Sequence, residues 1–309
     1  MCTLAVAAGH AGLARSRLCV DGQDLAATRN LKDCLILAPD TARKAMQFNA
    51  TQQAAQTLCE HRLGRTRFQG LPETCRPADE RAAYAVQATL HTLLGRSRLG
   101  RVAGHKIGCT TKVMQRFLNI DSPCAGGVYA NTIHRNSARL RHEEYLHVGV
   151  ECEVVVLLEA DLPSGESPHT RQSVSQAVAA IAAGMEIVDD RYENYKTMDT
   201  PTLIADDFFD AGCVIDDWIS DWQRLDLVSL TGRTLINGNE VGLGRSGDVM
   251  GHPFEALAWL ANSLNRRGQF LRSGEFVFTG SVVETRWVSP GDRVVIAIDS
   301  LGEARAEFV

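Results

Sequence analysis

The sequence predicts an α+β fold, in which a small helical N-terminal region precedes a larger domain rich in β-strands. Residues 41–100 place apolar side chains at helical spacing in an Ala- and Gln-rich background, which indicates helices. Residues 101–309 alternate short apolar runs with Gly, Asn and Pro, a pattern typical of strands and turns. Residues 1–40 show no clear periodicity, and we expect them to form a poorly ordered extension. A chain of 309 residues is long enough to bury the core of such a domain.

Two helices account for the N-terminal region. The first is expected over residues 41–63, where apolar residues recur every four positions. The second is expected over residues 77–94, because Pro77 suits a first-turn position and Gly95 follows the last apolar residue. The helical part of the protein therefore lies before residue 101.

Local turn signals and periods define the elements of the β-rich domain. The Asn237-Gly238 pair lies between two strand-like segments and predicts a hairpin over residues 234–241. Pro near the start and Gly268 past the end bound an amphipathic helix over 253–267. The other expected elements are strands over 276–279 and 293–298, and a small buried helix over 174–183.

A pair of acids interrupts the apolar run of residues 148–158. Glu151 and Glu153 are two positions apart, so in a strand both side chains point to the same face. Two adjacent carboxylates repel each other and are costly to desolvate, which suggests that a cation offsets the cost. The alternative is an edge strand whose polar face meets water.

A third acid favours the cation. Glu186 lies between Met185 and Ile187 in a short apolar segment, where an acid facing solvent is unexpected. The following acids and arginine, residues 189–191, are interpreted as surface charge at the end of that strand. We predict that the three glutamates (Glu151, Glu153 and Glu186) converge as oxygen ligands of Mg²⁺ or Mn²⁺. Zinc is not expected, because no Cys or His pair has zinc-ligand spacing.

Two further segments have the composition of ligand-binding loops. Lys106 is flanked by glycines in Gly104-His-Lys-Ile107-Gly108, where the backbone can approach a ligand and the amine can donate to a carboxylate or take part in proton transfer. The alternative is a solvated lysine in a turn. Thr279-Gly-Ser281 is a second tight polar loop, whose backbone could contact an anion.

Composition and spacing exclude several other classes of protein. A net charge of −5 without a basic stripe argues against nucleic acid as a partner. No apolar run approaches the roughly 20 residues that span a bilayer. Nine scattered cysteines without a C-x-x-C fit free thiols in a reducing compartment, so a cytoplasmic protein is expected. The match of residues 242–247 to G-x-G-x-x-G follows a hairpin strand and does not predict a dinucleotide site.

Taken in order, short motifs of this chain resemble the fumarylacetoacetate hydrolase superfamily, within it the branch of 2-oxopent-4-enoate hydratases and oxalocrotonate decarboxylases. The resemblance covers residue 42 to the C-terminus and is densest from residue 101. The motifs are Gly104-His-Lys-Ile-Gly108, Val150-Glu-Cys-Glu153, Gly184-Met-Glu-Ile-Val-Asp-Asp-Arg191, Ala205-Asp-Asp207, Trp259-Leu-Ala-Asn262 and Thr279-Gly-Ser281.

The resemblance implies a mixed β-roll catalytic domain over residues 101–309, a helical region over 41–100, and a homo-oligomer. It implies that the three glutamates hold the metal, that Lys106 is the active-site lysine, and that Ile107, Gly108, Thr279 and Ser281 contact substrate. The substrates implied are small 2-oxo acids, and the activity is addition of water to a 2-hydroxy-2,4-dienoate in aromatic-compound catabolism.

Two features depart from the family pattern. Hydratases of this type carry an acid after the lysine loop, whereas residues 126–131 contain none, so Asp206 is the candidate general base. Asp207-Phe208-Phe209 stands where the family often has Asn and small residues, and its bulk could reshape the pocket.

Three alternatives stay open. They are decarboxylation of an oxalocrotonate-like diacid, hydrolysis of acylpyruvates, and a noncatalytic oligomer stabilised by metal.

Overall fold

The computed structural model describes residues 40–112, 115–116 and 120–309. The expected extension over residues 1–40 lies outside the described residues apart from Asp40. The chain divides into two compact units, residues 1–44 and 45–309.

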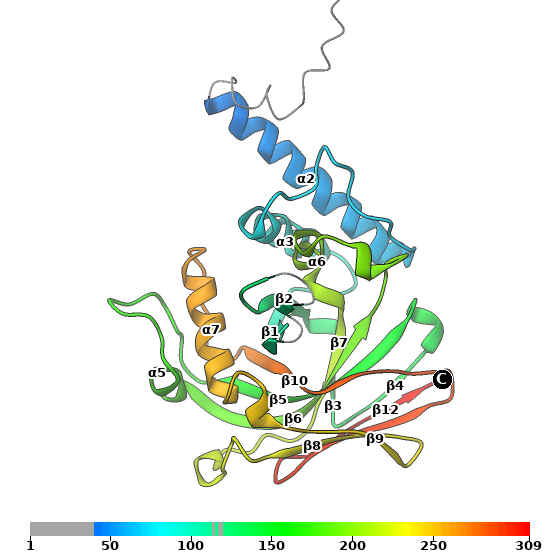
Figure 1. Ribbon diagram of the computed structural model, residues 1–309, viewed down its shortest axis with the longest axis vertical. Coiled ribbons are helices and arrows are strands. Elements are labelled where there is room, and N and C mark those ends of the chain that lie inside the picture. The colour runs from blue at the N-terminus through cyan, green and yellow to red at the C-terminus, as the bar shows by residue number, and fades with distance from the viewer. Residues whose placement is uncertain (1–39, 113–114, 117–119) are drawn as a thin grey trace, which may run out of the picture. The chain divides into compact units, whose positions relative to one another are not determined.

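Both predicted N-terminal helices are present. They are α2 (Asp40–Gly64) and α3 (Glu80–Leu94) (Figure 1). The Asp79 side chain caps α3 by accepting from the Ala82 amide, so the helix begins three residues after the predicted start. Helix α3 packs against α6 (Thr200–Ala205).

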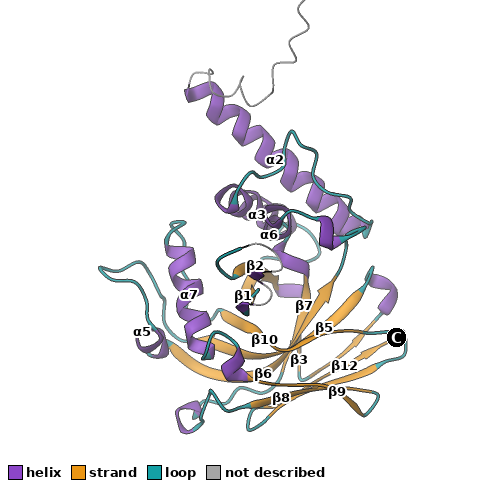
Figure 2. Cartoon of the chain, viewed as in Figure 1, coloured by secondary structure: helices purple, strands orange, loops and turns teal. Residues whose placement is uncertain are grey.

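The rest of the described residues form twelve strands, two further α-helices and six short 3-10 helices, joined by loops (Figure 2). The hairpin at Asn237-Gly238 and the helix from Pro253 are confirmed. The strands are β1 (Val102–Gly108), β2 (Cys124–Tyr129), β3 (Ile133–Arg135), β4 (Ser137–Leu140), β5 (Val148–Leu158), β6 (Val178–Asp189), β7 (Asp210–Ile215), β8 (Thr231–Ile236), β9 (Asn239–Arg245), β10 (Phe276–Trp287), β11 (Arg293–Ile298) and β12 (Gly302–Phe308), and the helices are α5 (Arg171–Ser175) and α7 (Pro253–Asn265).

The strands form two mixed sheets. The larger has the order β2-β1-β10-β5-β6-β7-β3, and the smaller has the order β4-β12-β11-β8-β9. Strands β1 and β10, β3 and β7, and β4 and β12 pair in parallel, and the other neighbours are antiparallel. The larger sheet curls. Its edge strand β2 contacts β7, which lies near the opposite edge of the sheet.

The two faces of the curled sheet carry different cores. The main core holds most buried apolar residues, including Ile107 and Cys152. A smaller cluster includes Val155 and Phe278, and alternation places Val155 on the same face of β5 as Glu151 and Glu153. The carboxylates therefore lie on the face that carries the smaller apolar cluster.

The helix predicted over residues 174–183 is wrong. Helix α5 ends at Ser175, and residues from Val178 onward form β6. Alanine favours helices, but β6 is buried between β5 and β7, where small side chains fit. The space there is tight, since a Cβ on Gly184 would lie 2.2 Å from Val155. Tertiary pairing overrides local propensity here.

The strand predicted over 276–279 is too short, because β10 continues through Gly280 to Trp287. Within the described part of the chain, no helix has both the length and the apolar character needed to cross a membrane.

Candidate metal centre

The three glutamates predicted as ligands come together on the larger sheet. Antiparallel pairing of β5 and β6 sets Glu151 directly opposite Glu186, and Glu153 follows two residues later on the same face. One carboxylate oxygen from each lies within 4.8 Å of the other two. Glu153 and Glu186 are buried, with 0% and 1% of their surface exposed, and Glu151 is half-buried.

The electrostatics of this trio favour a bound cation. Burial, followed by the charges of Glu186 and Glu151, raises the pKa of Glu153. Burial likewise raises the pKa of Glu186. Oε1 of Glu153 and Oε2 of Glu186 have no hydrogen-bond partner among the described residues. Buried carboxylate oxygens without partners fit a hard divalent ion such as Mg²⁺ or Mn²⁺.

Two neighbours orient the carboxylates. The Gly280 amide donates to Oε2 of Glu153 over 2.7 Å, and the Thr285 hydroxyl donates to Glu151. Gly280 has a φ of +115°, and a Cβ there would lie 2.5 Å from Thr110, so only glycine fits this position. The Gly280 amide thus orients Glu153, one of the predicted metal ligands.

Lys106 lies beside the trio with its ammonium fixed from two sides. Its Nζ is 3.0 Å from Oε1 of Glu186 and donates to the Phe208 carbonyl oxygen over 2.9 Å. Although burial acts to lower it, the charges of Glu186 and Glu151 raise the pKa of Lys106 above its ordinary value. The lysine is therefore a buried cation in a strand, and not a solvated side chain in a turn.

The Phe208 carbonyl is presented by an unusual turn that sequence reasoning did not predict. Asp207, Phe208 and Phe209 all have positive φ, at 55°, 50° and 71°. Each such conformation costs a non-glycine residue about 1 kcal/mol, so the surroundings must hold the turn in place.

The Asp207 carboxylate provides that anchor. Although burial acts in the opposite direction, His91 and Arg62 hold the pKa of Asp207 below its usual range, so the anchor is charged. Four groups contact the carboxylate: Arg62 Nη1 at 2.9 Å, His91 Nε2 at 2.6 Å, the Gly127 amide at 2.9 Å and the Tyr129 hydroxyl at 2.8 Å.

Asp206, the candidate general base, lies in a different set of contacts. Its Oδ2 accepts from Arg191 Nη2 and from the Tyr192 hydroxyl, each over 2.9 Å. The interpretation of residues 189–191 as surface charge is wrong, because all three are buried and Arg191 Nη1 donates to the Asp210 carbonyl oxygen at the start of β7. Asp206 as a base stays a prediction.

The residues predicted to contact substrate differ in where they lie relative to the three glutamates and Lys106. Gly108 is adjacent to the site, since a Cβ there would lie 3.6 Å from Lys106 Nζ. Ile107 points into the main core, on the opposite face of β1 from Lys106. The Thr279 hydroxyl donates to the Val154 carbonyl oxygen, and the Ser281 hydroxyl donates to the Val283 carbonyl oxygen.

Asp210 is a buried acid that the sequence did not single out. Its Oδ2 accepts from Arg62 over 2.9 Å, whereas its Oδ1 has no partner among the described residues. Burial raises the pKa of Asp210 to about 6. Asp210 follows the left-handed turn directly. The cluster of acids at residues 206–210 was the sequence feature that could have indicated it.

A buried cluster of carboxylates beside a charged lysine, inside a curled sheet, is typical of a metal-dependent enzyme. A model of the family described as fumarylacetoacetate (FAA) hydrolase C-terminal matches residues 126–309. The chain therefore belongs to the fumarylacetoacetate hydrolase family, which confirms the predicted resemblance.

Similar proteins extend the match beyond that region. The chain is 32% identical over 228 residues to 2-hydroxyhexa-2,4-dienoate hydratase from Comamonas testosteroni, covering 72% of this chain and 85% of that protein. It is 28% identical over 260 residues to 2-keto-4-pentenoate hydratase from Burkholderia vietnamiensis, covering 84% and 98%. The solved structure of 4-oxalocrotonate decarboxylase from Pseudomonas putida G7, complexed with magnesium and adipate, has a TM-score of 0.78, 24% identity, and covers 84% of this chain and 97% of that one. This likeness confirms the fold.

Proposed function

We propose that the protein is a metal-dependent hydro-lyase that adds water to a 2-hydroxy-2,4-dienoate, through its 2-oxo tautomer, to give a 4-hydroxy-2-oxo acid in aromatic-compound catabolism. The observation that carries the proposal is the convergence of Glu151, Glu153 and Glu186 within 4.8 Å beside Lys106. Similarity to a 2-keto-4-pentenoate hydratase and to a 2-hydroxyhexa-2,4-dienoate hydratase supports the reaction class.

The three glutamates would hold Mg²⁺ or Mn²⁺, and the other members of the site would act on the substrate. A divalent ion bound there would supply Lewis-acid chemistry toward the carboxylate and 2-oxo oxygen of a 2-oxo acid. Lys106, charged and fixed by the Phe208 carbonyl, can donate a charge-assisted hydrogen bond to the same carboxylate. Its limited freedom favours one orientation of the substrate.

Decarboxylation of an oxalocrotonate-like 2-oxo diacid is the second candidate. Strand β2 contains no carboxylate, and hydration needs a base to take a proton from water, whereas loss of carbon dioxide does not. In the decarboxylation the C–C bond to the leaving carboxylate breaks and its electron pair enters the enol system. Both reactions use the same cation site.

The test is a substrate panel with the full chain. Loss of the ultraviolet absorbance of 2-hydroxypenta-2,4-dienoate, dependent on Mg²⁺ and abolished by chelation, is expected, together with a 4-hydroxy-2-oxo product. Release of carbon dioxide from an oxalocrotonate with no hydration of the dienoate would select the second candidate. Metal binding with neither reaction would leave acylpyruvate hydrolysis or the noncatalytic oligomer.

We also propose a homo-oligomer in the cytoplasm. The family resemblance supports the oligomer, and six buried free cysteines among the described residues suit a reducing compartment. Light scattering of the purified protein and cell fractionation test the two statements.

A further inference from the structure

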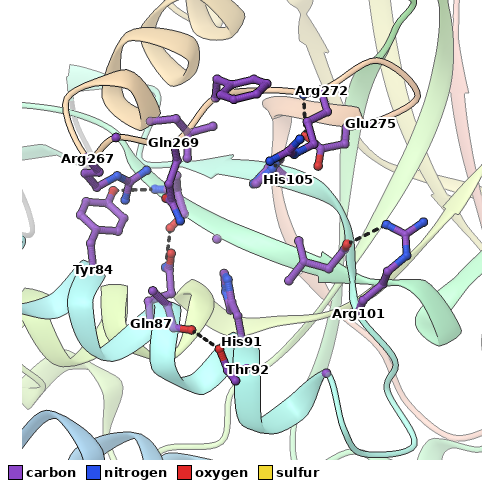
Figure 3. A pocket seen from close by; sticks show the side chains of 18 residues that line it. Tyr84, Gln87, His91, Thr92, Arg101, His105, Arg267, Gln269, Arg272 and Glu275 are labelled. Atoms are coloured by element: carbon purple, nitrogen blue, oxygen red, sulfur yellow. Dashed lines mark hydrogen bonds and ion pairs between the residues drawn. The ribbon is translucent and has the colours of Figure 1, made fainter. Parts of the chain in front are cut away.

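A hollow separate from the metal centre lies between α3, the beginning of β1 and the segment that follows α7. Its volume is about 500 Å³, which suits a small molecule (Figure 3). His105 lines it, and because side chains alternate along β1, His105 leaves the strand on the opposite face from Lys106. Among the described residues that line the hollow, none is a member of the glutamate trio.

The lining of the hollow is strongly cationic. Arg101, Arg267 and Arg272 contribute three guanidinium groups, and Glu275 is the one carboxylate among the described lining residues. Glu275 already has partners, because it lies 3.5 Å from His105 Nε2 and accepts from the Arg272 amide over 2.9 Å. The positive charge is therefore largely uncompensated.

Arg267 shows the consequence of this imbalance most clearly. Its guanidinium lies over the Tyr84 ring, 3.6 Å from the centroid. The Nε atom is buried and has no hydrogen-bond partner among the described residues. Burial lowers the pKa of Arg267, although Tyr84 and the charge of Glu80 act to raise it. A buried cationic donor without an acceptor is costly, and an anionic ligand would satisfy it.

We propose that this hollow binds a small dianion, either a dicarboxylate or a phosphate. Figure 3 shows Arg267 and Arg101 on opposite sides of the hollow, with His91 and His105 between them. One anionic group would pair with Arg267 and the other with Arg101 or Arg272. Arginine suits this role, because its planar guanidinium matches both carboxylate and phosphate.

Calorimetric titration of the Mg²⁺-loaded full chain with glutarate, and separately with inorganic phosphate, tests the site. Arg267→Gln and Arg101→Gln should each weaken binding by about tenfold or more, the loss expected for one charge-assisted hydrogen bond. Arg101 is exposed and makes only a 3.4 Å bond to the Val102 carbonyl, so its substitution is compatible with folding. Arg139→Gln, at an exposed position of β4 in the smaller sheet, is the matched control and should bind as the unmodified protein does.

The outcomes separate this proposal from the proposed function. Glu153→Gln should leave anion binding in the hollow unchanged even where it abolishes turnover. Tighter binding of glutarate supports a dicarboxylate ligand, and tighter binding of phosphate supports a phosphate ligand. The proposal is overturned if neither anion binds, if Arg139→Gln weakens binding as much as Arg267→Gln, or if only Glu153→Gln removes binding, since the anion would then be at the metal centre.

Discussion

Replacing Glu153 by Gln removes one charge from the buried trio while keeping the shape of the side chain. With ligand atoms within 4.8 Å, two charged carboxylates repel by about 3 kcal/mol at an effective dielectric constant of about 20. Burial and this repulsion raise the pKa of Glu153 in the metal-free protein. We therefore expect the metal-free variant to be as stable as the unmodified protein, or more stable by up to about 3 kcal/mol.

The same substitution should remove metal-dependent behaviour. Loss of an outer contact to a metal ligand typically costs 10- to 100-fold in affinity, so loss of a ligand should cost at least about a hundredfold. Turnover of the dienoate should disappear with the metal.

Thermal unfolding with chelator and with Mg²⁺ measures both effects. Mg²⁺ at about 100 times its Kd should stabilise the unmodified protein by about 2.7 kcal/mol, or roughly 5 °C. Glu153→Gln should lose most of that shift. Glu159→Gln, exposed just beyond the end of β5, is the control and should keep it. Full Mg²⁺-dependent turnover by Glu153→Gln would refute the ligand assignment.

Three other predictions concern the neighbours of the trio. Lys106→Met should reduce kcat far more than Mn²⁺ affinity, and a titration of bound Mn²⁺ showing the reverse would overturn its role. Asp207→Asn should cost about 3 kcal/mol in urea unfolding at pH 7, because Arg62 loses one of its buried anionic partners and His91 loses its own. Because the pKa of Asp207 is lowered in the folded state, this group stabilises the protein above about pH 4, and the stability is lost as the pH falls further. The free energy of unfolding of the variant should therefore fall less at acid pH than that of the unmodified protein. Equal pH profiles of the unfolding free energy would contradict this. Gly126→Ala should lower kcat at least about tenfold. The added Cβ would lie 2.6 Å from the Asp207 carbonyl oxygen and would displace the turn that holds Lys106. Gly165→Ala is the control and should leave kcat unchanged, because its Cβ would have one contact, at 3.8 Å.

Much of the candidate site was predictable because its members obey local rules. The two-residue period of a strand places Glu151 and Glu153 on one face, whatever the rest of the fold does. An acid flanked by Met185 and Ile187 in an apolar segment indicated a buried role for Glu186. The Asn237-Gly238 hairpin and the helix from Pro253 were predictable for the same reason, since their signals lie within a few residues.

Other features depended on contacts that no local pattern encodes. Alanine-rich residues 178–183 favour a helix in isolation, and only burial between two strands makes them a strand. The Asp207 turn has positive φ at three non-glycine residues, which no sequence preference predicts. It is held by a carboxylate whose partners come from α2, α3 and β2.

The sequence by itself determined which side chains could bind a cation, and that Glu151 and Glu153 would lie on the same face of one strand. The tertiary structure decided that Glu186 stands opposite Glu151 and that Lys106 lies beside both, because strand register and sheet curling are set by pairing between distant segments. It also decided that the arginines at 101 and 267 share one hollow. Periodicity acts over a few residues, whereas these juxtapositions depend on packing across the whole sheet.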